Sequence, residues 1–294
     1  MASHREAIVG VDNYSYHRLL GEVRSGEAAP RAGNWRWPDT VHSATGSGAD
    51  VLAVETCFID DPADVRSFAR QRNPLVMLSW GHPYGLEYGT SPEAERDLVD
   101  WVTVAADMDA RRMRIVIAHP ALRERLWTQE NRERTIHALS RVSALAGEYG
   151  LELGIENHAD LTARELVEVI LEVDAPNLGV CFDLANAVRV GDDPLDAAHV
   201  LAPFTRVMHV KDVDARGAFG LSGPPSVPLG TGSLPVRDAI GVVTQQQPDA
   251  WLLVEIAQIE DPHADEEEWV SRDIAWIRDV LNSMDPPLGA VRRP

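Results

Sequence analysis

The sequence contains little of what marks exported, disulfide-linked or membrane proteins. Only two cysteines occur in 294 residues, Cys57 and Cys181, so a disulfide framework is not indicated. Because both cysteines lie in apolar runs, we expect each thiol to be a small buried side chain. The N-terminal apolar run is too short for the core of a signal peptide or for a membrane span. These absences predict a cytoplasmic protein.

Basic residues are also scarce. Lysine and arginine total 27 against 46 aspartates and glutamates, which gives a net charge of −19 and an isoelectric point near 4.8. The sequence shows no basic patch that could attract a phosphate backbone, so we expect no nucleic-acid partner. The same charge disfavours a phosphorylated substrate, although a local pair of arginines would reverse that expectation.

The length and composition indicate one large globular domain. The hydrophobic share of 45% and the charged share of 25% are average for such domains. A chain of 294 residues is somewhat longer than the ~250 typical of a single eight-stranded α/β barrel. We therefore expect one domain over residues 1–294, with loose tails at 1–6 and 286–294.

Short apolar, β-branched runs alternate with amphipathic stretches along the chain. The helical stretches are expected at residues 60–72, 92–107, 130–149, 162–173 and 266–281, with Ser91 and Thr162 as N-caps. Strands buried on both faces read as nearly continuous hydrophobic runs. Eight such runs occur, and they predict a single-domain (β/α)₈ barrel: AIVGVD, VLAVET, LVMLSW, RIVIAH, LELGIE, LGVCFD, RVMHVK and WLLVEI.

Two of the connections are unusually long, at residues 19–38 and 212–234. Both follow a strand, so both would project from the face of the barrel that carries the strands' C-terminal ends, where long loops often cover a substrate. Trp35 and Trp37 lie in the first connection. Their indole rings could stack on a sugar ring or pack against the barrel rim.

Each of the last four strands ends in a polar residue: Glu156, Asp183, His209 and Glu255. Strand ends converge at one face of a barrel, and three buried carboxylates without a cation would repel one another and bind protons. Taken singly, such residues often cap a helix or pair with a basic residue. Together they predict one divalent metal ion. Three oxygens and one nitrogen suit Mn²⁺, our first choice, or Mg²⁺, and would tolerate Co²⁺ or Zn²⁺.

The segments around these positions match a known pattern. GIENH, GVCFD, HVKDVD and VEI occur in that order on those strands, and GTGSLPV follows a Gly/Pro-rich loop. The chain thus resembles, over nearly its whole length, the xylose isomerase-like superfamily of sugar isomerases, epimerases and cyclitol dehydratases. The resemblance implies that Glu156 and Glu255 are both metal ligands and the acid/base pair, one on each face of the substrate.

Several activities are compatible with this chemistry. Removal of a proton next to a metal-bound carbonyl gives an enediolate, and return of the proton completes isomerisation or epimerisation of a keto-sugar or cyclitol. Loss of a β-substituent would instead make the protein a lyase: an inosose- or dehydroshikimate-type dehydratase, or a β-eliminase of 3-keto-glycosides or C-glycosides. An apurinic-site endonuclease would need about three zinc ions, which the ligand count opposes. A non-catalytic sugar-binding barrel is the remaining alternative.

Further residues are candidate substrate contacts. Ketose 3-epimerases usually carry a histidine three residues after the sixth-strand aspartate, where this chain has Asn186, while Arg216 could replace an arginine of those enzymes. His158 and Lys211 share the inward phase of Glu156 and His209; Lys211 could neutralise an enolate or pair with Asp212. The other candidates are His82 and His119 as proton shuttles, and Glu55 as a partner of substrate hydroxyls or of a metal ligand. The oligomeric state is left open.

Overall fold

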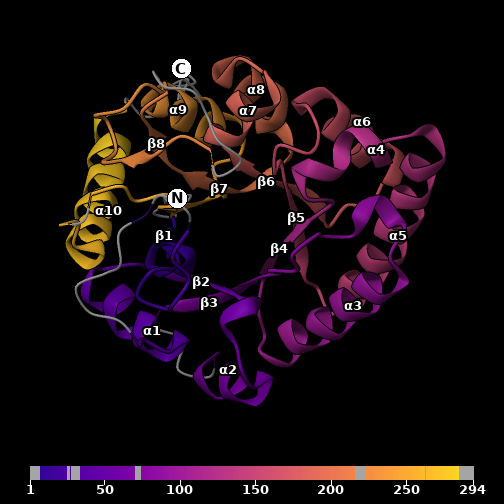
Figure 1. The fold of residues 1–294 in the computed structure, drawn as a ribbon, viewed down its shortest axis with the longest axis horizontal. Helices are drawn as coiled ribbons and strands as arrows, with labels where there is room; N and C mark the ends of the chain where they lie inside the picture. The colour runs from indigo at the N-terminus through magenta and orange to yellow at the C-terminus, as the bar shows by residue number, and fades with distance from the viewer. Residues whose placement is uncertain are drawn as a thin grey trace, which may run out of the picture.

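The computed structural model describes residues 7–24, 27, 34–69, 74–215, 223–261 and 263–284. Eight parallel strands close into a barrel in the order β1-β10-β7-β6-β5-β4-β3-β2, and helices surround it as an outer ring (Figure 1). This confirms the predicted (β/α)₈ barrel. The predicted tails at 1–6 and 286–294 lie outside the described residues. The barrel strands are β1 (Val9–Asp12), β2 (Val51–Glu55), β3 (Leu75–Ser79), β4 (Arg112–Val116), β5 (Glu152–Glu156), β6 (Leu178–Asp183), β7 (Thr205–Val210) and β10 (Trp251–Val254).

Five helices lie where the sequence predicts them. Ser91 accepts from the backbone N–H of Ala94, and Thr162 forms a reciprocal capping box with Glu165, as expected from the sequence. The α-helices are α1 (Trp37–Gly46), α2 (Pro62–Ala69), α3 (Pro92–Asp107), α4 (Arg123–Leu126), α5 (Gln129–Glu148), α6 (Ala163–Val173), α7 (Leu184–Val190), α8 (Pro194–Leu201), α9 (Val236–Gln246) and α10 (Glu266–Ser283). The 3₁₀ turns are η1 (Asn13–Tyr16), η2 (Thr56–Phe58), η3 (Glu87–Gly89), η4 (Pro120–Leu122) and η5 (Ala202–Phe204).

The two long connections contain more structure than the sequence analysis predicts. Helix α1 begins at Trp37, inside the first of them. The second contains a short antiparallel ribbon of β8 (Asp212–Val213) and β9 (Ser226–Val227). Because this ribbon follows β7 directly, it stands on the face of the barrel where the strands end.

A small hydrophobic cluster fills the interior of the barrel. Side chains alternate along a strand, so every second residue faces the barrel axis. The interior cluster is formed by Val51, Ala53, Met77, Cys181, Val207, Trp251 and Leu253. A larger cluster packs the other faces of the strands against the surrounding helices. On each strand, the residue two positions beyond a member of this interior cluster therefore also faces the barrel axis.

The two cysteines differ in burial. Cys181 is buried as predicted, but the prediction is wrong for Cys57, which is exposed because it lies in the 3₁₀ turn η2 rather than in β2. Within the described segments, no helix combines the length and apolar character that crossing a membrane requires. The cytoplasmic location stays a prediction.

Candidate metal centre

A ring of polar side chains lies at or near the C-terminal ends of the barrel strands, with Arg114 in the middle of β4 as the exception. Five of its members stand two residues beyond a residue of the interior cluster, so strand phase turns them inward. All eight are buried except Glu255, whose side chain is 10% exposed. The ring consists of Asp12, Glu55, Ser79, Arg114, Glu156, Asp183, His209 and Glu255.

Four members of this ring converge on one point. Glu156, Asp183, His209 and Glu255 each offer one ligand atom, and these four atoms all lie within 4.8 Å of one another. They stand at the ends of β5, β6, β7 and β10, which are consecutive neighbours in the barrel. The structure therefore brings together the four residues that the sequence singles out.

The atoms of this cluster are suited to a cation. His209 Nδ1 lies 2.7 Å from Glu255 Oε2. Glu156 Oε2 lies 3.0 Å from Arg114 Nε, and within the described part of the chain none of these atoms has a partner in full hydrogen-bond geometry. Buried polar atoms without a partner are costly. A divalent cation would satisfy them, and three carboxylates with one imidazole form a donor set that such ions accept.

Lys211 lies beside this cluster. Its Nζ is 2.8 Å from Asp183 Oδ2 and 3.2 Å from Glu255 Oε1, so it bridges two of the carboxylates. It is the only lysine in the chain, in which the other 26 basic Lys/Arg residues are arginine. Burial opposes its charge, but Asp183 and Glu255 raise the pKa of Lys211 above its usual value, so the amine is protonated.

Lys211 does not pair with its neighbour Asp212, one of the two roles considered from the sequence. The Asp212 carboxylate instead accepts backbone N–H groups of the segment GTGSLPV: Gly230 at 3.1 Å, Gly232 at 2.9 Å and Leu234 at 3.2 Å. This carboxylate therefore fixes the segment that follows the β8–β9 ribbon. The Lys211 ammonium instead contacts Asp183 and Glu255 of the cluster.

Arg114 is a second buried cation at the site, and the sequence analysis missed it. It points inward from the middle of β4, and its Nε lies 3.0 Å from Glu156 Oε2. The same guanidinium pairs with Glu55 and donates to the backbone oxygen of Trp80. Glu55, a candidate from the sequence, thus contacts Arg114. Arg114 therefore links Glu55 at the end of β2 to Glu156 at the end of β5.

Asn186 takes the position where ketose 3-epimerases usually have a histidine. Its Nδ2 donates to Glu156 Oε1 at 3.0 Å and to Asp183 Oδ2 at 2.9 Å. The other oxygen of Asp183 caps helix α7 by accepting from the backbone N–H groups of Ala185 and Asn186. In this structure Asn186 therefore holds two cluster carboxylates in place. Nothing in the residue type alone signalled that contact.

Asp12 is another member of the ring that the sequence analysis missed. Its Oδ2 accepts from Ser79 Oγ at 2.9 Å and lies 3.7 Å from His209 Nε2. Asp12 ends the first strand just as Asp183 ends the sixth, so the strand-end signal was present in VGVD. A carboxylate beside the second ring nitrogen is a common partner of a metal-binding histidine.

Five carboxylates, those of Asp12, Glu55, Glu156, Asp183 and Glu255, lie at this centre beside three basic side chains, Arg114, Lys211 and His209. Burial raises the pKa of Glu55 well above its usual value, and it also raises the pKa of Asp12 and of Asp183, against the opposing charges of Arg114, His209 and Lys211. For Glu255 burial acts in the same direction, but Lys211 and His209 hold its pKa well below normal. A further cation would therefore be stabilised here.

Three further histidines are candidates from the sequence: His82, His119 and His158. His82 stacks on Trp80, and His119 caps the turn η4 by accepting from the backbone N–H of Ala121. Both contacts fit local structural roles. His158 is different because its Nδ1 is buried with no hydrogen-bond partner among the described residues. Burial, followed by the charges of nearby arginines, lowers the pKa of His158 to about 3.

The two tryptophans of the first long connection pack against protein. Trp37 is 1% exposed and belongs to the hydrophobic core, and Trp35 packs against that core with its ring 5.6 Å from the ring of Tyr16. These contacts fit the packing alternative, and for Trp37 they leave no ring face open to a sugar. Arg216 lies outside the described residues.

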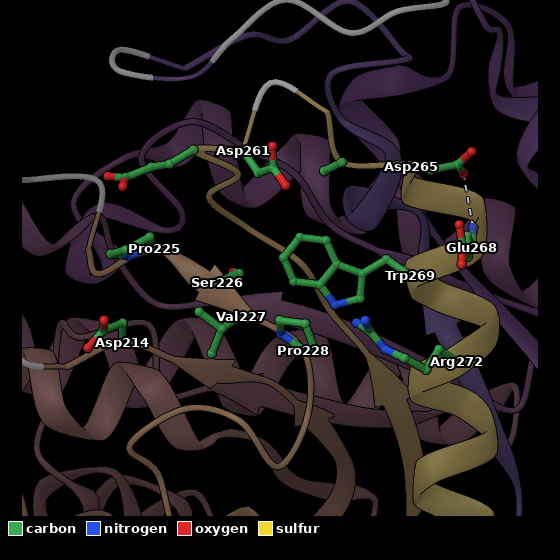
Figure 2. Close-up of a pocket in the computed structure, with 12 residues that line it drawn as sticks. Asp214, Pro225, Ser226, Val227, Pro228, Asp261, Asp265, Glu268, Trp269 and Arg272 are labelled. Carbon is green, nitrogen blue, oxygen red and sulfur yellow. Dashed lines mark hydrogen bonds between the residues drawn. The ribbon is translucent and has the colours of Figure 1, made fainter.

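A separate pocket of about 460 Å³ opens between the β8–β9 ribbon and the start of α10. In Figure 2, Trp269 and Arg272 project from α10 toward Pro228, with Asp261 above them. None of the four cluster residues lines this pocket. Its carboxylates make it unsuited to an anionic ligand: Asp214, Glu260, Asp261, Asp265 and Glu268.

The model of one protein family matches residues 47–280, and its description is the xylose isomerase-like TIM barrel. The chain belongs to this family. The resemblance noted in the sequence is thereby confirmed, and the match includes all four residues of the cluster.

Curated relatives of this xylose isomerase-like barrel match only in part, since the alignments span from 27% to 44% of their lengths. A 3-oxo-isoapionate decarboxylase of Pectobacterium atrosepticum is 26% identical over 127 residues, 43% of this chain and 44% of the relative. A 3-dehydroshikimate dehydratase of Bacillus anthracis is 23% identical over 110 residues, 36% of this chain and 39% of the relative.

Solved structures match over most of the chain. An L-ribulose 3-epimerase superposes with a TM-score of 0.70 at 17% identity, covering 94% of this chain and 95% of that one. The IOLI protein, solved with a bound zinc atom, superposes with a TM-score of 0.69 at 12% identity over 94% and 99% of the two chains. At these identities the superpositions show a shared fold. The proteins that this chain resembles thus include an epimerase of the same fold, a dehydratase and a decarboxylase.

Proposed function

We propose that this protein is a divalent-metal-dependent isomerase or epimerase that moves a proton next to the carbonyl group of a keto-sugar or cyclitol. The observation that carries the proposal is the cluster of four side chains from consecutive strands, each of which offers one ligand atom within 4.8 Å of the other three. The epimerase among the related structures supports the same reaction class.

Glu156, Asp183, His209 and Glu255 would hold the ion, and their oxygen-rich donor set favours Mn²⁺ over Zn²⁺. When bound, the ion would polarise the substrate carbonyl and stabilise the negative charge that forms when the neighbouring proton leaves. Lys211 and Arg114 would keep the cluster carboxylates oriented and partly neutralised.

Two carboxylates, Glu156 and Glu255, are available to move the proton. They extend from β5 and β10, which are separated in the barrel by β6 and β7. A proton removed by one carboxylate and delivered by the other on the opposite face of the substrate gives epimerisation. A proton returned to the adjacent carbon gives aldose–ketose isomerisation.

A lyase is the second candidate, and the surroundings of Glu156 favour it. One oxygen of Glu156 accepts from Asn186, and the other lies against Arg114. Glu255 is held as well, by His209 at 2.7 Å and Lys211 at 3.2 Å, but elimination needs only one base next to the carbonyl, so only one of the two carboxylates has to act. The dehydratase and the decarboxylase among the relatives support this alternative.

The test is product analysis by NMR in D₂O with metal-loaded protein and a panel of keto-sugars, inososes and 3-keto-glycosides. We expect deuterium to enter one carbon next to the carbonyl, and the product then distinguishes isomerase, epimerase and lyase. Glu255→Gln should slow this exchange by ~10²–10⁴ because it removes the base and keeps the shape. Glu95→Gln, on the outer surface of α3, is the matched control. Turnover to an isomer or epimer without any exchange would contradict proton transfer at carbon, whereas elimination is recognised by its unsaturated product.

A further inference from the structure

The strand β10 loses its neighbour β1 just before the proposed metal ligand Glu255. β1 pairs with β10 in parallel register as far as Val11, which lies opposite Val254, and the chain then enters the 3₁₀ turn η1. On the other side of β10, the backbone N–H of Glu255 donates to the backbone oxygen of Val210 at 3.3 Å. The backbone oxygen of Val254 and the N–H of Ile256 therefore face the side that β1 has left, and such buried groups need a partner.

Ser15 supplies the partner for both of these backbone groups. It lies in η1 and is fully buried. Its Oγ donates to the backbone oxygen of Val254 at 3.2 Å and accepts from the backbone N–H of Ile256 at 3.1 Å. One hydroxyl thus does what a further residue of β1 would do in a longer strand. It fixes the two peptide groups on either side of Glu255.

Ser226 holds the next part of the same segment. This serine lies in β9, within the second long connection, and is also buried. Its Oγ accepts from the backbone N–H of Ala257 at 3.1 Å and of Gln258 at 3.4 Å, and its own N–H donates to the backbone oxygen of Gln258 at 2.8 Å. The chain after Glu255 belongs to no helix or strand, so these bonds set its path.

Glu255 is held from two directions. Its carboxylate contacts His209 and Lys211, which both lie at the end of β7, on one side of β10. On the opposite side, where β1 neighbours β10, the bonds of Ser15 hold the backbone. Asn186 donates directly to the other two carboxylate ligands, whereas Ser15 contacts Glu255 only through its flanking peptide groups.

We propose that Ser15 and Ser226 are positioning residues of the metal centre, which direct the Glu255 carboxylate toward the ion by fixing the backbone around it. The inference rests on the proposed function, because it concerns a ligand of the same centre. Ser15 should have the larger effect, since its bonds flank Glu255 directly and those of Ser226 begin two residues further along.

The experiment measures the affinity of the full chain for Mn²⁺ alone, from the EPR signal of the free ion. Ser15→Ala and Ser226→Ala remove the two hydroxyls. Ser43→Ala is the matched control, because Ser43 is also a buried serine and its Oγ donates at 3.1 Å to the hydroxyl of Tyr16, in the same turn η1. This control separates positioning of Glu255 from general loosening of η1.

We expect Ser15→Ala to weaken Mn²⁺ binding by roughly tenfold to a hundredfold, the range found when a residue that orients a metal ligand is removed. Ser226→Ala should cause a smaller loss, and Ser43→Ala should bind Mn²⁺ like the wild type. Melting temperatures check that each variant is folded. Ser226→Ala carries the test if Ser15→Ala does not fold.

A double-mutant cycle then shows whether Ser15 acts through Glu255. It is measured with Zn²⁺, which binds such ligands more tightly than Mn²⁺ and so suits weakened variants. In a Glu255→Ala background, Ser15→Ala should cause no further loss of affinity. In a Glu156→Ala background it should cause its full loss, because independent effects add.

Unchanged Mn²⁺ affinity in both serine variants would overturn the proposal. An equal loss from Ser15→Ala with and without the Glu255 carboxylate would also overturn it, since the effect would then be general. These results leave the proposed function intact if the wild type binds Mn²⁺. A wild type that binds no Mn²⁺ would overturn the proposed function, and this inference with it.

Discussion

Replacement of Lys211 by methionine removes the positive charge that lies between two carboxylates of the centre and keeps a side chain of similar length. Lys211 is 7% exposed and bridges Asp183, which is fully buried, and Glu255, which is 10% exposed. Removal of one partner from a buried ion pair typically destabilises a protein by ~3–5 kcal/mol, because the remaining charge is left uncompensated. Lys211→Met should therefore lower the free energy of unfolding of the metal-free protein by about that amount.

The loss should shrink when the metal is bound. A divalent ion at the cluster compensates the same two carboxylates, so we expect a loss of only about 1 kcal/mol at saturating Mn²⁺. By linkage, the variant should then bind the ion more tightly by about 2–4 kcal/mol, a factor of roughly 30 to 1,000.

Urea unfolding with a chelator and with excess Mn²⁺ measures both quantities. Arg112→Met is the control, because Arg112 is also buried but pairs with Glu152 at the opposite end of the barrel, at 2.8 Å. It should lose the same stability under both conditions. An equal loss for Lys211→Met with and without metal would refute the idea that the ammonium and the ion balance the same carboxylates.

Three further predictions concern single side chains. Asp12→Asn keeps the acceptor that caps η1 but removes the charge beside His209, so metal affinity measured by chelator competition should fall by ~10- to 100-fold; an unchanged affinity would exclude that role. Trp37→Ala should lower the free energy of unfolding by ~3–5 kcal/mol and leave the metal content intact, whereas loss of metal without destabilisation would contradict its place in the core. Burial raises the pKa of Asp160 to about 7. The folded protein then binds the proton more tightly than the unfolded chain, so its free energy of unfolding should fall between about pH 4 and pH 7 relative to that of Asp160→Asn. The same pH dependence of the free energy of unfolding in both proteins, measured by urea unfolding, would contradict this.

The barrel and the four converging residues were predictable because strand phase is local. Each apolar run marks a strand, and its last inward position is set by a period of two residues. Glu156, Asp183, His209 and Glu255 therefore follow from the sequence once the eight runs are recognised. The same rule would have found Asp12 at the end of β1.

The contacts around the cluster were less predictable because they join residues distant in the sequence. Arg114 and Glu55 are 59 residues apart, and the orientation of the arginine depends on barrel closure. Asn186 was singled out as a departure from the epimerase pattern, but its bonds to two cluster carboxylates depend on the start of α7. Trp37 reads as part of a loop until α1 is placed against the barrel.

The metal content of the purified protein tests the central claim most directly. Elemental analysis of the wild type, reconstituted with Mn²⁺ and then desalted, should give about one divalent ion per chain, because the four ligands form a single closed cluster. His209→Ala, which removes the only nitrogen ligand, should retain much less, and His137→Ala, on the outer helix α5, should retain the full amount. A wild type with no bound ion, or a His209→Ala variant with full occupancy, would contradict the account.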